Sequence, residues 1–266
     1  MKIITWNVNR FNGNSMLEIW DDAKERYFKE VFEYINSHDI GNDDIVLFQE
    51  FPCQRKNSGM LDEIKEKYEI LSWYDLNEKF GKTENRSNKI RFRTIAIVSK
   101  KSNWNLKKFD EAINFGKDGD KFNYVNRYVH LINEKKEIEL LGIHMPARDI
   151  EKDKPDYGIE ELINAIDNTN CIPHIIVGDF NAGDYQKNDK DQDFIENREN
   201  YNKFVEKYNY IDVIKNKKTT NYRTPTEIDH VLIKEEFLKE YELENANVDY
   251  KELSDHYPII VKLKMK

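Results

Sequence analysis

The most informative segment of this chain lies at residues 174–184 and has the sequence HIIVGDFNAGD. The β-branched run at residues 175–177 predicts a short buried strand, and Gly178 allows the backbone to turn where that strand ends. Asp179 and Asn181 follow two residues apart, and such residues point to the same side in extended backbone. A carboxylate and an amide that emerge together suit the binding and orientation of a water molecule. Aspartate, asparagine and glycine are also common in turns, so a purely structural turn is the alternative interpretation.

The composition is typical of a globular protein with an acidic balance. The chain has 266 residues, 39% of them hydrophobic, and its 42 lysines and arginines face 50 aspartates and glutamates, for a net charge of −8. This length fits one large domain or two small ones, and the absence of a linker favours a single domain over residues 1–266. An acidic chain is not drawn to nucleic acid by its overall field. Any phosphate group must therefore be held by local cations or by a bound metal ion.

The sequence contains no signal for a membrane or for secretion. No apolar run approaches the ~18 residues that suggest a membrane span. The start, MKIITWNVN, lacks the apolar stretch and the cleavage site of a secretory signal. The two cysteines, Cys53 and Cys171, show no pattern typical of a disulfide framework. We therefore expect free thiols and a cytoplasmic location.

Alternating hydrophobic patterns predict a mixed α/β fold. Strands are expected at residues 2–6, 44–49, 69–74, 91–99, 122–132, 137–143, 175–177, 219–223, 228–233, 243–248 and 257–263. Helices are expected at residues 16–38, 58–68 and 154–169, and a last helix that ends near Tyr208 follows a charged loop at residues 185–200. Residues 77–88 are expected to form a loop, and residues 115–120 (FGKDGD) a turn between two strands.

Polar side chains stand at one end of six of these apolar segments. Four of them follow their segment, and they are Asn7, Glu50, His144 and Asp179. The others precede their segment, and they are Asp229 and the pair Asp255 and His256. Because antiparallel neighbours bring the end of one strand beside the start of the next, all of these side chains can meet on one edge of the sheets.

This set of side chains has a coherent chemistry. Glu50 and Asp255 can bind a hard cation such as Mg²⁺, and Asn7 adds a neutral oxygen. The two histidines and Asp179 remain for proton transfer, since an imidazole titrates near neutral pH. Arginines in or beside the segments can bind phosphate oxygens, and they are Arg10, Arg93, Arg127 and Arg148. Four further histidines are interpreted as structural residues beside apolar runs, and they are His38, His130, His174 and His230.

Six short motifs resemble, in the same order, those of the endonuclease/exonuclease/phosphatase superfamily, which includes pancreatic deoxyribonuclease and exonuclease III. They are TWNVN, LFQE, GIHMPAR, VGDFNAGD, IDHVLI and SDHYPI, and they span residues 5–259. The resemblance implies a four-layer α/β/β/α sandwich, in which two mixed β-sheets pack face to face with helices outside. It also implies hydrolysis of a phosphoester that depends on Mg²⁺ or Mn²⁺, with one or two ions.

The resemblance also implies roles for the metal-binding and water-positioning residues. By motif position, Glu50 resembles the principal metal ligand, with Asn7 and Asp255 close to the metal. Asp179 and Asn181 resemble the residues that position the attacking water and the phosphate.

The histidines of the motifs resemble catalytic residues of the family. His256 resembles the catalytic histidine of the SDH motif, with Asp229 as the carboxylate that orients it. His144 resembles the second histidine of the deoxyribonuclease branch. One departure concerns Asn9, which stands where several DNA-repair relatives carry an aspartate, so that the secondary metal ligand is missing there.

The expected activity is cleavage of DNA by a metal-dependent endonuclease, with Arg10, Arg127 and Arg148 as phosphate-binding residues. Two alternatives stay open at this point. A phosphatase or phospholipase-type enzyme of the same superfamily would act on a small or lipid phosphoester. A binding module without catalysis would use the same fold, although it would be expected to have lost some of the catalytic residues.

Overall fold

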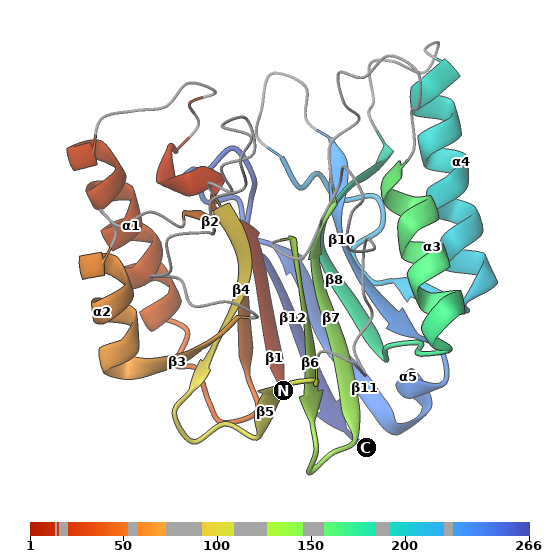
Figure 1. Cartoon of the computed structure of the whole chain (residues 1–266), viewed down its shortest axis with the longest axis horizontal. Helices are drawn as coiled ribbons and strands as arrows, with labels where there is room; N and C mark the ends of the chain where they lie inside the picture. The colour runs from red at the N-terminus through yellow and green to blue at the C-terminus, as the bar shows by residue number, and fades with distance from the viewer. Residues whose placement is uncertain are drawn as a thin grey trace, which may run out of the picture.

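The computed structural model of the chain describes residues 1–13, 15, 21–52, 58–72, 92–108, 127–145, 157–184, 192–220 and 226–266. The strands in these ranges form two six-stranded sheets. The sheets pack face to face, and helices cover their outer faces on both sides (Figure 1). The expected four-layer α/β/β/α sandwich is therefore confirmed.

The first sheet has the strand order β11-β12-β1-β2-β4-β3. Its strands are β1 (Lys2–Asn7), β2 (Ile45–Pro52), β3 (Tyr68–Leu71), β4 (Phe92–Ser99), β11 (Tyr241–Val248) and β12 (Ile259–Met265). Strands β1 and β2 run parallel, and the other neighbours run antiparallel. Helices α1 (Asp21–Asn36) and α2 (Ser58–Lys67) follow β1 and β2 in the chain. A short 3₁₀ turn, η1 (Asn9–Phe11), lies between β1 and α1.

The second sheet has the order β5-β6-β7-β8-β10-β9. Its strands are β5 (Trp104–Leu106), β6 (Tyr128–Asn133), β7 (Ile138–His144), β8 (Ile175–Asp184), β9 (Tyr210–Asp212) and β10 (Glu227–Lys234). Here β7 and β8 are the parallel pair, and the other neighbours are antiparallel. The helices of this part are α3 (Tyr157–Thr169), α4 (Gln192–Lys207) and the short α5 (Phe237–Glu240).

The described elements repeat the same order twice along the chain. The first half runs β1-α1-β2-α2-β3-β4-β5-β6, and the second half runs β7-α3-β8-α4-β9-β10-β11-β12, apart from the two short helical turns. In each half the last two strands join the sheet of the other half. Each sheet therefore contains strands from both halves, and each parallel pair lies at the centre of its sheet.

The core explains why the strands are almost continuously apolar. In β10 every residue is buried, as expected for a strand covered on both faces. Between the sheets, Leu47 of β2 and Val231 of β10 belong to one apolar cluster. On the outer face, α1 buries a stripe that includes Phe28 and Phe32. Each such side chain contributes roughly 1.5–3 kcal/mol when it leaves water.

Most of the predicted elements are present, but several predictions are wrong. The predicted strand at residues 219–223 is reduced, in its described part, to one isolated bridge between Thr220 and His256. Helix α4 begins at Gln192, inside the predicted loop. The charged residues of this stretch suggested a loop, but a helix can also carry them on its exposed face. The strands β5 and β9 were not predicted, since three residues are too short to show a period. The predicted loop at 77–88 and the turn at 115–120 lie outside the described residues.

Gly178 shows why the central strand carries a glycine. Its φ is +138°, a value that other residues rarely adopt, and a Cβ atom built there would lie 2.0 Å from the carbonyl oxygen of Ile143 in β7. The two parallel strands β7 and β8 therefore approach closely just before the candidate site residues His144 and Asp179. Only glycine fits this position without moving backbone.

We expect Gly178→Ala to lower the free energy of unfolding by about 3 kcal/mol, because it combines backbone strain with a clash against main chain. The matched control is Gly59→Ala in α2, where an added Cβ meets nothing within 4 Å. That variant should change the free energy of unfolding by less than about 1 kcal/mol. Urea denaturation of both variants measures the difference, and equal values would contradict this account of Gly178.

Candidate active site

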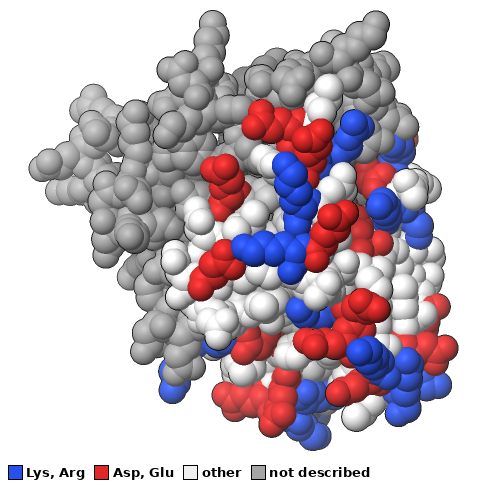
Figure 2. Space-filling view, turned by 90° about the vertical axis from the view of Figure 1, so that its right-hand side faces the viewer, with Lys and Arg blue, Asp and Glu red and all other residues white. Residues whose placement is uncertain are grey.

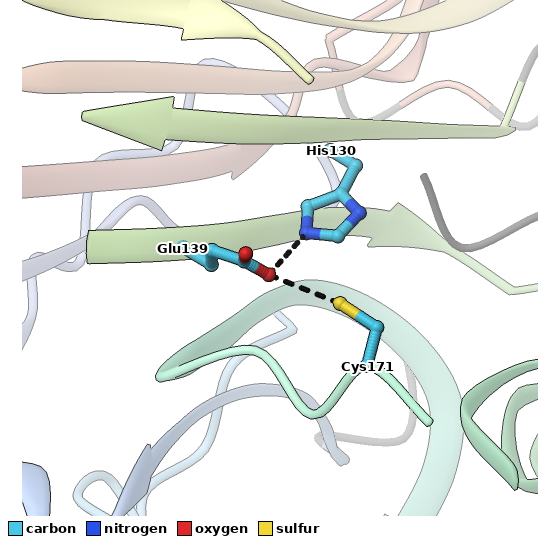
Figure 3. Close-up of side chains that lie close together, drawn as sticks. All are labelled: His130, Glu139 and Cys171. Carbon is cyan, nitrogen blue, oxygen red and sulfur yellow. Dashed lines mark hydrogen bonds and ion pairs between the residues drawn. The ribbon is translucent and has the colours of Figure 1, made fainter. Parts of the chain in front are cut away.

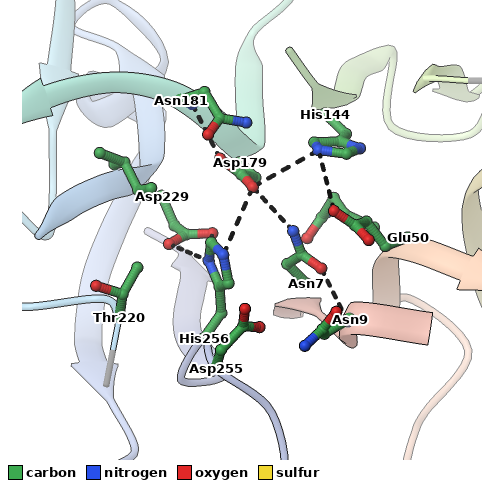
Figure 4. Close-up of polar contacts among 12 residues, drawn as sticks. Asn7, Asn9, Glu50, His144, Asp179, Asn181, Thr220, Asp229, Asp255 and His256 are labelled. Atoms are coloured by element: carbon green, nitrogen blue, oxygen red, sulfur yellow. Dashed lines mark hydrogen bonds and ion pairs between the residues drawn. The ribbon is translucent and has the colours of Figure 1, made fainter. Parts of the chain in front are cut away.

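Asp179 lies where the two sheets meet. It is in β8, only 1% exposed, and its Oδ2 accepts a hydrogen bond of 2.9 Å from Nδ2 of Asn7 in β1 of the other sheet. Within its own sheet it is paired with His144 of β7 and with Asp229 of β10. Sequence positions 7, 144, 179 and 229 therefore converge as expected, as Figure 4 shows.

A bulge in β2 turns Glu50 toward this group. The pairing of β2 with β4 shifts between Phe48 and Phe51, and Glu50 has a φ of +52°. Its Oε1 lies 3.7 Å from Nε2 of His144, and its Oε2 lies 3.3 Å from Nε of Arg10. The prediction that Glu50 follows the end of its strand is wrong, because the bulge keeps β2 paired to Pro52.

The 3₁₀ turn η1 brings Arg10 to Glu50. Its residues Asn9, Arg10 and Phe11 have φ values of +43°, +53° and +59°. Oδ1 of Asn7 accepts a hydrogen bond of 2.9 Å from the backbone N–H of Asn9. The Asn9 side chain in turn donates to the carbonyl oxygen of Gly13. Asn9 is thus used to hold this turn.

His256 is held by a carboxylate. Its Nδ1 lies 2.8 Å and 3.0 Å from the two oxygens of Asp229, and since a carboxylate only accepts, Nδ1 carries a proton. Its Nε2 lies 3.8 Å from Oδ2 of Asp179. Burial alone would lower the pKa of His256, but the carboxylates of Asp229 and Asp179 raise it to about 10. The sequence therefore predicted the contact between Asp229 and His256 correctly.

Several residues that were not predicted hold this pair in place. Thr219 Oγ1 accepts the backbone N–H of Asp229 at 3.1 Å, and its carbonyl oxygen accepts the N–H of Tyr257 at 2.8 Å. Nε1 of Trp6 donates to the carbonyl oxygen of His256 at 2.9 Å. These side chains act on backbone atoms of distant segments, so no local pattern in the sequence could reveal them.

His144 is a neutral, buried imidazole. Burial is the main cause that lowers its pKa well below the usual value, and the charges of Arg127 and His256 act in the same direction. Its Nε2 lies 3.8 Å from Oδ2 of Asp179. Its Nδ1 is buried and has no hydrogen-bond partner among the described residues. His144 and His256 therefore face the same oxygen of Asp179.

Asn181 contacts Asp179 in a way that the sequence argument did not predict. Its φ of +47° shows that the backbone is not extended at Asn181, so the assumption of extended backbone from which the prediction was made does not hold there. The backbone N–H of Asn181 donates to Oδ1 of Asp179 at 2.9 Å. Its side-chain Nδ2 donates to the carbonyl oxygen of Met145 at 2.8 Å. The turn thus ties the two parallel strands β7 and β8 together.

The predicted arginines have different positions. Arg127 precedes β6, with its guanidinium carbon 5.3 Å from the centre of the Phe92 ring. Arg93 is buried in β4. Arg148 lies outside the described residues. Of the arginines predicted to bind phosphate, Arg10 contacts Glu50, and the charge of Arg127 lowers the pKa of Glu50 and of His144.

The donor groups of the site fit a hard divalent cation. Four carboxylates gather there, and they are Glu50, Asp179, Asp229 and Asp255. Burial, in each case the largest cause, raises the pKa of Glu50, Asp179 and Asp255. Arg10 and His256 supply positive charge by contact, and Arg127 acts at longer range. The carboxylates still outnumber these cations, and oxygen donors with excess negative charge suit Mg²⁺ or Mn²⁺.

A second histidine–aspartate pair supports the turn that contains Asn181. His230, next to Asp229 in β10, has Nδ1 2.8 Å from Oδ2 of Asp212 and Nε2 2.8 Å from the carbonyl oxygen of Ala182. Both neighbours are acceptors, so both ring nitrogens carry protons and His230 is a cation. Burial opposes this charge, but Asp212 raises the pKa of His230. The hydroxyl of Tyr201 also donates to Asp212, and its ring stacks on His230.

A comparison with family models supports the sequence motifs. The model described as an endonuclease-reverse transcriptase matches residues 145–260. That range contains the GDFN, IDH and SDH motifs. A search of curated proteins gave no match. Among the described residues, no helix combines the length and apolar character that crossing a bilayer requires.

Solved structures share the fold over the whole chain. The 3′ phosphatase NExo from Neisseria, bound to a product DNA hairpin, is 14% identical with a TM-score of 0.63, and 99% of each chain is covered. The catalytic domain of human nocturnin, with a bound sulfate anion, is 15% identical with a TM-score of 0.64, covering 100% of this chain and 93% of that chain. TDP2 from D. rerio, complexed with a single strand DNA product, is 13% identical with a TM-score of 0.59, covering 100% and 99%. At such identities the likeness shows that the fold is the same.

The buried pair of His230 and Asp212 predicts a defined pH dependence of stability. A raised pKa means that the contribution of His230 is complete below the unfolded value of about 6.5 and is lost as the pH rises through the folded pKa. We expect His230→Gln to lower the free energy of unfolding by about 3 kcal/mol at pH 6. Above the unfolded pKa of about 6.5, the difference in free energy of unfolding between the wild type and His230→Gln should shrink by up to about 1.4 kcal/mol per pH unit.

Denaturation in urea between pH 5 and pH 9 measures this difference. The matched control is His174→Gln, because burial lowers the pKa of His174 and its contribution changes with pH in the opposite direction. A difference between the wild type and His230→Gln that stays constant over this range would show that His230 is not a cation in the folded protein.

Proposed function

We propose that the chain is a metal-dependent nuclease of the endonuclease/exonuclease/phosphatase superfamily that hydrolyses phosphodiester bonds in DNA; the family model that matches residues 145–260 and the shared fold support this proposal. The observation that carries this proposal is the buried group around Asp179. Two imidazoles lie 3.8 Å from one oxygen of this carboxylate, and the amide of Asn7 reaches it from the other sheet. Burial of several ionisable groups together costs free energy, and such groups are typical of functional sites.

A divalent metal ion belongs to this proposal. When bound, it would neutralise the negative charge that develops on the phosphate during hydrolysis. Glu50 and Asp255 would hold it through their carboxylates, with the amide oxygen of Asn7 close by. The predicted ion is Mg²⁺ or Mn²⁺, and one or two ions are expected.

Asp179 and His256 would align and activate the attacking water. An oxygen atom can lie about 2.8 Å from both Oδ2 of Asp179 and Nε2 of His256, because these atoms are 3.8 Å apart. Asp229 fixes the imidazole by accepting a hydrogen bond from Nδ1–H, so that Nε2 faces the reacting groups. Asn181 fixes Asp179 through its backbone N–H. Water held in this way is oriented for in-line attack on phosphorus.

His144 lies on the other side of the same carboxylate oxygen. As a neutral imidazole it can donate one hydrogen bond through Nε2, and it would assist the oxygen that leaves phosphorus. Arg10, Arg127 and Arg148 would bind phosphate oxygens. The proposal thus assigns His256 to the attacking water and His144 to the leaving oxygen.

DNA is the proposed substrate because two of the structural relatives are described with DNA products bound. The surface gives a weaker argument. Figure 2 shows the side of the molecule that carries α3 and α4, where lysine and arginine are interspersed with aspartate and glutamate. The described part of this one face has no continuous basic track of the kind that binds a long duplex. The contacts with DNA would then be made close to the catalytic group.

A second candidate function is that of a phosphatase within the same superfamily. The description of the Neisseria protein as a 3′ phosphatase favours it. A cytoplasmic location stays a prediction for either candidate.

Asp179→Asn tests the central residue. We expect the rate of hydrolysis to fall about 10²–10⁴-fold, because the amide keeps the shape but cannot accept the proton. The control is Asp167→Asn on α3, which makes the same chemical change in an exposed ion pair with Lys207 and should leave the rate unchanged. Circular dichroism verifies folding of both variants. A rate for Asp179→Asn close to that of the wild type would remove Asp179 from the mechanism.

A substrate panel tests the reaction and the metal. We expect the protein to cut supercoiled plasmid DNA in the presence of Mg²⁺ or Mn²⁺ and to lose this activity when a chelator removes the metal. The same assays are run with a DNA hairpin carrying a 3′ phosphate, with inositol phosphates and with sphingomyelin. Release of phosphate from the hairpin without cutting of the plasmid would favour the phosphatase instead, and cleavage that persists in chelator would overturn the metal dependence.

A further inference from the structure

A second group of metal-binding side chains lies at the other end of the second sheet. Glu139 is near the start of β7, five residues before His144, so the two are roughly 17 Å apart along the strand. Beside Glu139 lie His130 of β6 and Cys171, which is in the connection between α3 and β8 (Figure 3). This group, His130–Glu139–Cys171, is separate from the active site.

The three side chains already point their donor atoms at one another. Oε2 of Glu139 lies 3.2 Å from Nε2 of His130 and 3.0 Å from Sγ of Cys171. One donor atom from each of the three residues lies within 4.8 Å of the others. They come from three different elements, so the fold and not local sequence brings them together, as Figure 3 shows.

These separations are close to those that a tetrahedral metal ion requires. Zinc binds sulfur at about 2.3 Å and nitrogen or oxygen at about 2.0–2.2 Å, which places neighbouring ligand atoms roughly 3.4–3.6 Å apart. The measured separations of 3.0 Å and 3.2 Å are therefore short by a few tenths of an ångström. Small side-chain adjustments would open the group enough to admit the ion.

Lys107 shows that this group attracts a cation. Its Nζ lies 2.7 Å from Oε1 of Glu139 and 3.2 Å from Sγ of Cys171. The ammonium group sits on a flexible chain of four carbons, so it can leave when a stronger cation arrives. A divalent ion would then compete with Lys107 for Glu139 and Cys171. This competition would weaken the binding of the ion.

We propose that His130, Glu139 and Cys171 form a binding site for a thiophilic divalent cation of the Zn²⁺ type, and that Lys107 is the cation displaced from it. On binding, the S–H bond of Cys171 breaks, the sulfur–metal bond forms and the proton passes to solvent. The resulting thiolate and the Glu139 carboxylate balance the two charges of the ion. Sulfur and imidazole donors select zinc-like ions over Mg²⁺, in contrast to the oxygen donors of the active site.

The site would join three parts of the second sheet. It would clamp β6, β7 and the connection that leads into β8, the strand that carries Asp179. The backbone N–H of Glu139 already donates to Nδ1 of His174, just before β8. A bound ion should therefore stabilise the folded protein, because the unfolded chain does not hold the three ligands together.

Cobalt provides a direct test, because a thiolate bound to Co²⁺ gives a charge-transfer absorption in the near ultraviolet. The experiment uses the full chain with Cys53→Ser, so that Cys171 is the single thiol, and with excess Mg²⁺ to occupy the oxygen donors of the active site. We expect the absorption to saturate at one Co²⁺ per chain and to disappear when Zn²⁺ is added. Adding Cys171→Ser should abolish it.

Lys107→Met is the second variant. Removal of the competing ammonium should tighten Co²⁺ binding about tenfold, and Zn²⁺ should raise the melting temperature of the Cys53→Ser protein but not that of the protein that also lacks Cys171. Absence of the absorption in the Cys53→Ser protein would overturn the proposal, as would an absorption that survives Cys171→Ser. Neither measurement uses catalysis, so failure here leaves the proposed nuclease function unaffected.

Discussion

The buried carboxylate of Asp179 must be hydrogen-bonded, and its partners come from both sheets. Its oxygens accept from the side chain of Asn7 in the first sheet and from the backbone of Asn181 in its own strand. A carboxylate buried without such partners would cost several kcal/mol. Strand pairing places His144 and Asp229 on either side of it. A slip of one residue in β7 or β10 would turn these side chains to the other face, so the proposed catalytic group requires correct register and correct packing of the sheets.

The residues around this carboxylate adopt backbone conformations that L-amino acids rarely use. Glu50 in β2 and Asn181 in β8 both have φ near +50°, and they lie in strands that correspond in the two halves of the chain. Each such conformation costs on the order of 1–3 kcal/mol. The apolar core between and outside the sheets offsets this cost. At both positions the unusual conformation turns a polar side chain out of the regular alternation of the strand.

The second sheet presents a different set of donor atoms at each end. At one end of β7, His144 faces carboxylates, and at the other end Glu139 lies among sulfur, imidazole and ammonium groups. One strand therefore connects an oxygen-rich site to a site with softer donors. Hard and soft donors prefer different ions. The two proposed metal sites, at opposite ends of this sheet, would therefore bind different metals.

Hydrophobic period is a local property, so the sequence alone predicted which segments become the central strands. It did not predict where two of them end, because β2 continues past Glu50 to Pro52 and β8 continues past Asp179 to Asp184. The sequence also contained the ordered motifs that predicted the superfamily and the contact between Asp229 and His256. The bulge at Glu50 could not be predicted from the sequence, because a bulge depends on the register of the partner strand. Only the tertiary structure decided that Thr219 supports Asp229 and that Cys171 meets His130, because strand order brings together residues that are distant in the chain.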